Sequence, residues 1–164
     1  LVGSPPRLEK NGGWGSEIVS FNTRSLPCLI PIYNLVKVGK ETKFTDAWLS
    51  EIDSPIALAA WYLDDGSLTQ NKNKDYKKVY GHAIRVSLGD STLEEANVVV
   101  RWLDRVWGVP AHARIDQKRA AGRKPEASIS IYKTMDVDAF LDIVEPYAPR
   151  CMRYKVERDY TYTT

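Results

Sequence analysis

The fold of this chain is decided by one stretch, Leu58-Ala59-Ala60-Trp61-Tyr62-Leu63-Asp64-Asp65-Gly66-Ser67. Ser54-Pro55 before it predicts a helix start, with serine as N-cap and proline at the first helical position. The apolar and small residues predict a helix to about Asp65, which Gly66 ends. Two acids at that end oppose the helix macrodipole, at a cost of a few tenths to about 1 kcal/mol. Something else must favour acids there, and a bound cation is the simplest candidate.

The composition is typical of one globular domain. The chain has 164 residues, of which 43% are hydrophobic and 27% are charged, enough to bury a core. No stretch approaches the roughly 20 apolar residues of a membrane helix. Cys28 and Cys151 lack metal-ligand spacing, which favours buried or free thiols in a reducing compartment. His82 and His112 are too few for a histidine-based metal site.

The charges are unevenly distributed, although the net charge is only +2. Residues 70–87 and residues 112–124 each carry five basic residues against one acid, whereas residues 134–146 carry four acids and no basic residue. This pattern predicts a basic side that suits a polyanion and an acidic side. Charge alone fits two solvated, lysine-rich loops equally well.

Shorter elements are predicted before the key helix. A strand is expected at residues 17–22, with residues 5–10 as its hairpin partner. A helix is expected at residues 25–38, where Pro31 should bend it or delay its start. A short helix is expected at residues 45–52.

Alternation of apolar and polar residues predicts three strands after Gly66. These strands cover residues 82–88, 111–118 and 127–132. The polar segment at residues 67–79 predicts an irregular strand pair or a long hairpin. Each alternating strand has one apolar face for helices and one polar face.

Two more helices are predicted between and after these strands. The segment Ser91 to Glu94 has the pattern of a capping box and predicts the start of a helix that ends at Gly108. Its inner face is expected to carry Leu93, Ala96, Val100, Leu103 and Trp107. A last helix, ended by Pro146, is also expected. The side chains that should face inward from it are Val137, Phe140, Leu141 and Val144.

The order of these elements from Pro55 predicts an α+β fold. The order is αββαββα, with helices behind an antiparallel sheet whose concave polar face can sit in a nucleic-acid groove. Residues 8–35 have the same strand, strand, helix order as residues 113–144. This suggests a degenerate internal repeat whose first copy lacks its opening part.

With this motif and this order, the chain resembles the LAGLIDADG homing endonucleases. Residues 58–66 occupy the nine positions of the motif that names the family, and the Leu-Ala start and the Asp-Gly end match directly. The ending W-Y-L-D-D-G-S resembles the second motif of the single-chain, two-repeat branch. The resemblance therefore implies the LAGLIDADG fold.

The resemblance also implies a division of the chain. Residues 1–47 look like the remnant of a first repeat, with two strands, a helix and a linker, and residues 48–164 look like a complete second repeat. The first motif is missing, because nothing in residues 1–52 is an apolar helix that ends in Asp-Gly. Three explanations remain: a fragment of a longer protein, a separate polypeptide for the missing part, or a binding protein that has lost cleavage.

The family's site residues carry over to named positions. Asp65 matches the acid that binds a divalent metal, most simply Mg²⁺, at the scissile phosphate. Lys155 matches the basic residue near that site, and Lys40 or Lys43 would be its first-repeat counterpart. Ala59 and Ala60 suit the close approach of two motif helices in the family.

The resemblance further implies nucleic-acid contacts from the strand face and from the hairpin loops. The residues of the strand face are Arg85, Arg114, Lys118, Ser128, Ser130 and Tyr132. The phosphate contacts from the loops are Lys77, Lys78, Arg123 and Lys124.

Two functions are consistent with these residues. The first is a site-specific, metal-dependent DNA endonuclease, or a fragment or subunit of one. The second is a non-catalytic RNA-binding protein of the same fold, such as an intron-splicing maturase-type factor or a component of an organellar ribonucleoprotein. The intact acid and lysine favour the first, whereas the missing motif and the modest net charge favour the second.

The expected partners are DNA, or structured RNA, and a cover for the apolar helix at residues 55–65. That cover would be the missing first-repeat half or a partner chain, because the helix is too apolar to face water. No membrane partner is expected. The family implies a mitochondrion or chloroplast, and otherwise an intracellular compartment.

Overall fold

The computed structural model describes residues 7–9, 18–20, 26–39, 41–72, 79–116 and 125–158. The chain separates into two compact units, Leu1–Lys40 and Glu41–Thr164. The sequence predicts a division into two repeats after residue 47. Compact units say nothing about whether a segment was duplicated, so this division stays a prediction.

The first unit contains a hairpin and a short helix. Strand β1 (Arg7–Glu9) pairs antiparallel with β2 (Ile18–Ser20). A 3₁₀ turn, η1 (Pro27–Leu29), precedes α1 (Ile30–Val36) and β3 (Lys37–Val38). The expected delay at Pro31 is therefore observed, because proline, which has no N–H, fits the first turn of a helix and not its interior.

The second unit begins with a short strand, β4 (Glu41–Thr42), and a short helix, α2 (Asp46–Ser50). From there it follows the αββαββα order that the sequence predicts. The elements are α3 (Pro55–Asp65), β5 (Gly66–Lys72), β6 (Val79–Ser87), α4 (Leu93–Trp107), β7 (His112–Asp116), β8 (Glu126–Ile131) and α5 (Thr134–Val144). Two 3₁₀ helices, η2 (Glu145–Tyr147) and η3 (Arg150–Lys155), follow them.

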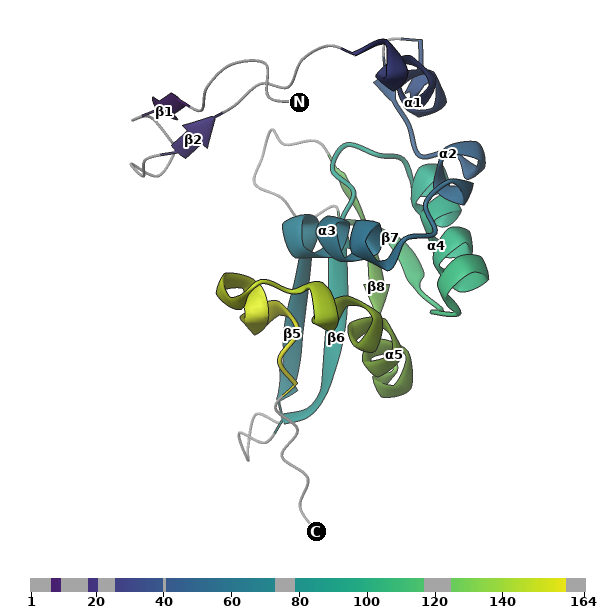
Figure 1. The fold of residues 1–164 in the computed structure, drawn as a ribbon. Coiled ribbons are helices and arrows are strands. Elements are labelled where there is room, and N and C mark those ends of the chain that lie inside the picture. Colours follow the sequence, from purple (N-terminus) through teal and green to yellow (C-terminus); the bar gives the residue numbers. More distant parts are fainter. Residues whose placement is uncertain are drawn as a thin grey trace. The chain divides into compact units, whose positions relative to one another are not determined.

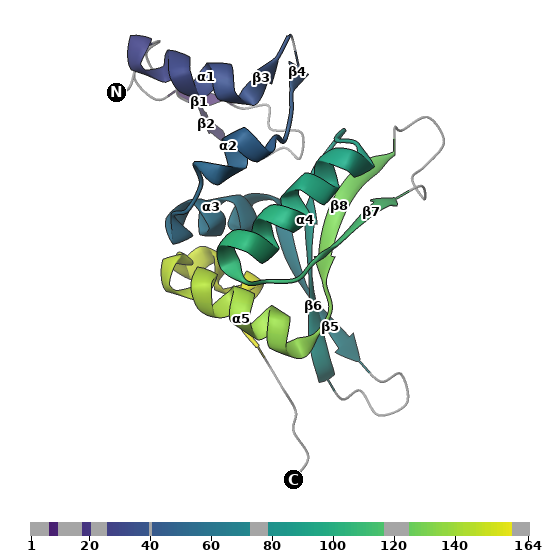
Figure 2. The same cartoon turned by 90° about the vertical axis from the view of Figure 1, so that its right-hand side faces the viewer.

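The sheet of the second unit has the strand order β5-β6-β8-β7, and every neighbouring pair is antiparallel. Figure 1 and Figure 2 show α3, α4 and α5 on one face of this sheet. The apolar core lies between the sheet and these helices, around fully buried residues such as Tyr62, Ile84, Leu103, Ile129 and Phe140. The predicted α+β fold is confirmed.

Helix α4 begins one residue later than the predicted capping box. Thr92 is the N-cap: its Oγ1 accepts from the Glu95 backbone N–H at 3.2 Å, and Glu95 Oε2 accepts from the Thr92 N–H at 2.8 Å. The predicted pairing of Ser91 with Glu94 is wrong, because the Ser91 hydroxyl instead donates to the Leu88 carbonyl at 2.7 Å. The helix ends as predicted at Gly108, which has a φ of 65°.

The apolar spacing in the sequence predicts the buried residues of α5 better than those of α4. In α5 the four predicted residues, Val137, Phe140, Leu141 and Val144, are all fully buried. In α4 the predicted Ala96 and Leu103 are buried, but Leu93 in the first turn is 46% exposed. Val99 and Trp102 are also buried there, and Trp102 Nε1 donates to the Ile52 carbonyl at 3.2 Å.

Two general features accompany the fold. In the part of the chain that the structure describes, no helix is long and apolar enough to cross a membrane. Cys28 and Cys151 are free thiols, and both are exposed.

The junction between α3 and β5 is unusually tight. The Gly66 N–H donates to the Tyr62 carbonyl, and the chain enters β5 at once with an extended φ of −90°. A Cβ added at Gly66 would overlap the Tyr62 ring and its carbonyl oxygen. Glycine is therefore required here for close approach and not for a left-handed backbone.

Gly66→Ala should lower the free energy of unfolding by about 1 to 3 kcal/mol, because the added methyl group overpacks the helix end. Urea denaturation followed by circular dichroism measures the loss. Gly81→Ala in β6 is the matched control, since a Cβ there meets only ordinary contacts at 3.7 and 3.9 Å. Equal denaturation midpoints for both variants would contradict the close-approach argument.

Candidate nucleic-acid interface and metal site

The predicted metal-binding acid lies at the C-terminal end of α3. Asp64 and Asp65 are both exposed there. Lys155 Nζ donates to the carbonyl oxygen of Leu63 at 2.7 Å and to that of Asp64 at 3.2 Å. An ammonium group on the last carbonyls offsets the negative end of the helix dipole and the two acids. Lys155 thus supplies positive charge at the helix end, where the two acids alone suggested a bound cation.

The position of Lys155 is set from the core by Tyr62. The Tyr62 hydroxyl donates to the Lys155 carbonyl oxygen at 2.6 Å. Its ring is fully buried and packs edge-on against Phe140, with ring centroids 5.1 Å apart. Burial raises the pKa of Tyr62 well above its usual range, so the hydroxyl keeps its proton and remains a donor. The end of α3 and the segment around Lys155 therefore form one connected structure.

An ion-pair cluster fixes the same segment on its far side. Arg158 donates to Asp142 at 2.9 Å, to Glu145 at 2.8 Å and to Asp138 at 3.4 Å. Arg153 also donates to Glu145, at 3.2 Å. The segment that the sequence predicts as the acidic side of the molecule is thus partly paired with basic residues from the end of the described chain.

The acids at the end of α3 are suitable donors for Mg²⁺. Magnesium binds hard oxygen ligands, and it commonly takes one or two carboxylates and completes its shell with waters and phosphate oxygens. Asp64 and Asp65 offer two exposed carboxylates at one place. Within residues that the structure describes, no cluster of three or more His, Cys, Asp or Glu residues could hold a metal alone. Waters and phosphate oxygens would therefore have to complete such a site.

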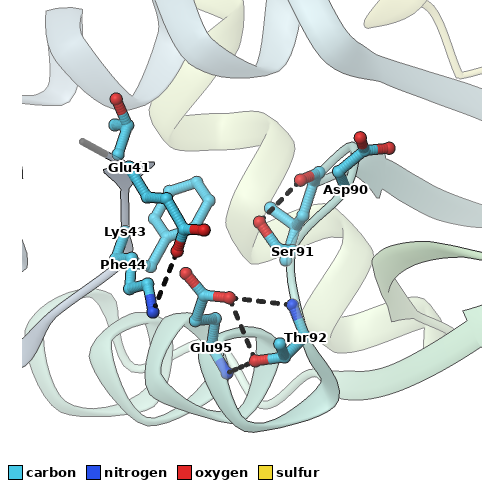
Figure 3. A pocket seen from close by; sticks show the side chains of 9 residues that line it. Glu41, Lys43, Phe44, Asp90, Ser91, Thr92 and Glu95 are labelled. Atoms are coloured by element: carbon cyan, nitrogen blue, oxygen red, sulfur yellow. Dashed lines mark hydrogen bonds and ion pairs between the residues drawn. The ribbon is translucent and has the colours of Figure 1, made fainter. Parts of the chain in front are cut away.

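Of the two first-repeat lysine candidates, the structure describes only Lys43. Lys43 forms an ion pair with Glu41 at 3.2 Å, and both line a cavity of about 620 Å³ at the start of α4. Figure 3 shows this pair beside Glu95, which is bound to Thr92. Over the described ranges, no ion pair joins Lys43 to Asp65. Lys40 lies outside the described residues.

The polar side chains of the strands share the sheet face that the helices leave uncovered. The strand register places Arg85 of β6 opposite Ser130 of β8, and it places Arg114 of β7 opposite Ser128. Lys77, Lys78, Lys118, Arg123 and Lys124 lie outside the described residues, so their predicted contacts remain predictions.

Two of the predicted contact residues are buried. Ser128 is fully buried and Ser130 is 2% exposed, so their predicted nucleic-acid contacts stay predictions. An ion pair joins Arg85 and Asp116, whose strands flank β8 on either side, so the pair bridges the strand that carries both serines.

The remaining predicted contacts are exposed and connected. Arg114 NH1 donates to the Tyr132 hydroxyl at 3.1 Å, and Arg114 Nε lies 3.8 Å from an Asp116 carboxylate oxygen. The Tyr132 ring stacks on His112 with centroids 5.8 Å apart. A hydrogen bond with Ser130 and the nearby Arg114 lower the pKa of Tyr132, against the opposite effect of partial burial.

Sequence reasoning assigned no role to Asp116 in this network. The available signal was that Asp116 is the one acid in the basic segment at residues 112–124 and alternates with Arg114 along one strand face. Its pairing with Arg85 depends on the strand order, which the sequence did not predict.

The two predicted helix-interface residues, Ala59 and Ala60, differ in exposure. Ile56 is 61% exposed, and Ala60 and Asp64 are exposed on the same side of α3, four residues apart each time. Together with Tyr147, Pro149 and Met152 these residues line a groove of about 320 Å³. Ala59, by contrast, is only 1% exposed and belongs to the apolar core.

Comparison with known protein families matches residues 3–132 to the LAGLIDADG DNA endonuclease family. The chain therefore belongs to the LAGLIDADG DNA endonuclease family.

Several curated proteins share part of this sequence. Protein RecA of Mycobacterium leprae is 25% identical over 158 residues, which cover 95% of this chain and 21% of that protein. Protein RecA of Mycolicibacterium chitae is 28% identical over 142 residues, which cover 87% of this chain and 32% of that protein. An uncharacterized protein of Methanocaldococcus jannaschii, MJ1098, is 34% identical over 99 residues, which cover 60% of this chain and 34% of that protein. The chain thus spans about a fifth to a third of these relatives.

One solved structure supports the fold directly. The homing endonuclease I-WcaI bound to its DNA recognition sequence superposes with a TM-score of 0.73 at 18% identity. The match covers 96% of this chain and 66% of that chain. At this identity the likeness establishes the fold, and the roles of individual residues remain to be argued from their chemistry.

Lys155→Met should lower the free energy of unfolding by about 1 to 2 kcal/mol, because it leaves the α3 carbonyls without their charged donor. Urea denaturation measures the effect. Lys133→Met, an exposed lysine at the start of α5, removes the same charge and serves as the control. Equal stability losses in the two variants would show that Lys155 does not cap α3.

Proposed function

We propose that this chain is the DNA-binding and metal-binding half of a site-specific, metal-dependent DNA endonuclease. The observation that carries the proposal is the exposed pair Asp64 and Asp65 at the end of α3, with Lys155 fixed on the same helix end. Asp64 and Asp65 lie within residues 3–132, which match a family of DNA endonucleases. I-WcaI, which has the same fold, is bound to DNA in its structure.

Each part of the second unit has a role in this proposal. The open sheet face, with Arg85, Arg114 and Tyr132, binds the duplex, and Asp65 holds Mg²⁺ at a phosphate. When bound, the metal supplies Lewis-acid stabilisation of the charge that develops on the phosphate oxygens. Lys155 keeps the acids in place and puts a fixed positive charge beside the same phosphate.

A second active site must come from elsewhere if both DNA strands are cut. The sequence carries one such acid motif, and we propose that a partner chain or a further segment supplies the other. It would pack on the stripe of Ile56, Ala60 and Asp64, where an exposed apolar side chain and a small residue allow two helices to approach closely.

Binding of structured RNA without cleavage is the second candidate function. Two observations favour it: the sequence holds a single acid motif, and Asp116 partly neutralises the arginines of the described sheet face. Both features weaken the case for a tight, free-standing DNA nuclease, because phosphate contacts dominate such affinity.

Asp65→Asn should lower Mg²⁺-dependent DNA cleavage by on the order of 100-fold or more, since a metal contributes several kcal/mol to such a reaction. The assay incubates the chain with supercoiled plasmids that carry random inserts and measures conversion to nicked circles. Nicking is the expected product of the chain alone, because one acid pair serves one strand. Chelation of Mg²⁺ should abolish it.

Asp104→Asn, an exposed acid on α4, is the control for the loss of one negative charge. Its activity should equal that of the unmodified chain. Undiminished nicking by folded Asp65→Asn would refute the proposed metal site. Binding of structured RNA with no nicking by any sample would support the second candidate.

A further inference from the structure

Asp116 occupies an unexpected place on a surface that is proposed to bind a polyanion. Its carboxylate is paired with Arg85, and it lies 3.8 Å from Arg114 Nε. Its side chain is only 22% exposed, whereas those of Arg85 and Arg114 are 44% and 51% exposed. The acid is thus enclosed between two arginines that remain accessible.

The strand order explains how one acid reaches both arginines. Arg114 and Asp116 alternate along β7, while Arg85 lies on β6, with β8 in between. The Arg85 side chain therefore reaches across β8 to Asp116. On the other side, Arg114 also donates to Tyr132, so the contacts run from Arg85 through Asp116 and Arg114 to Tyr132.

Stability does not account for Asp116. Ion pairs between partly exposed side chains contribute about 0 to 1 kcal/mol at most sites. On a nucleic-acid-binding face the acid also has a cost, because it repels phosphates and removes one unit of positive charge from the sequence-independent attraction. The role of Asp116 must therefore lie in its effect on how Arg85 and Arg114 contact DNA.

A fixed arginine can recognise a base that a flexible one recognises poorly. The planar guanidinium donates two parallel hydrogen bonds to N7 and O6 of guanine, and holding it in place reduces the entropy lost on binding. An acid repels the DNA phosphates at every sequence, but it leaves these base contacts possible. It therefore increases the difference in affinity between target and non-target DNA.

We propose that Asp116 is a specificity-determining residue that positions Arg85 and Arg114 to read guanine in the DNA major groove and weakens binding to non-target duplex. This inference rests on the proposed function of the sheet face in DNA binding.

Asp116→Asn keeps the side-chain shape and removes the charge. The full chain is used to select sequences from a randomised double-stranded DNA library, and its affinity for one random-sequence duplex is measured over a range of salt concentrations. The variant should bind the random duplex several-fold more tightly, with a salt slope steeper by about 0.9, since one positive charge is released for a phosphate contact. Its selected sequences should contain fewer preferred guanines.

Two comparisons make the result specific. Asp104→Asn on α4 causes the same change in net charge away from the sheet and should leave both measurements unchanged. Arg114→Lys keeps the charge but loses the planar fork, so it should reduce the guanine preference at an unchanged salt slope.

Equal guanine preference and equal salt slope in Asp116→Asn and the unmodified chain would overturn the inference, as would an unchanged preference in Arg114→Lys. If the unmodified chain itself selects no sequence from the library, the proposed DNA-binding function fails, and this inference fails with it. The behaviour of the unmodified chain thus separates the two failures.

Discussion

The candidate site depends on the hydrogen bonds between Lys155 and the last carbonyls of α3. Two aspartates at a helix C-terminus are electrostatically unfavourable, and an ammonium group on the carbonyls of Leu63 and Asp64 offsets that cost. Tyr62 fixes the backbone of Lys155 from the core, and Gly66 lets β5 start against the Tyr62 ring. The acids are therefore displayed from a rigid junction, which is what a metal-binding site on a scaffold requires.

Local signals in the sequence predicted α3 and α5 well. Ser54-Pro55 and Gly66 mark the ends of α3 by short-range chemistry, and the apolar spacing of α5 identified its buried side chains. The capping box of α4 was misplaced by one residue because two adjacent hydroxyl residues are followed by two adjacent glutamates, so the pattern fits in two registers. The two registers are distinguished by the reciprocal hydrogen bonds of Thr92 and Glu95 and by the bond of the Ser91 hydroxyl to the Leu88 carbonyl.

Contacts between residues far apart in the chain could not be predicted from the sequence. Alternation placed Ser128 and Ser130 on the polar face, but it predicted neither their burial nor the ion pair between two strands that are not neighbours in the sheet. The uneven charge distribution was read as two separate surfaces. In the structure, Arg158 returns to the acidic side of α5 and neutralises part of it, so segment charge in the sequence overstates the charge of the surface.

The contact between α3 and Lys155 joins residues that are more than 90 positions apart in the chain. During synthesis the helix and the sheet are complete before Lys155 leaves the ribosome, because chains emerge from the N-terminus first. Until then the helix end carries two acids with no compensating charge. The end of α3 is consequently completed later than the sheet beside it, because its compensating charge comes from a residue that is synthesised after every strand of that sheet.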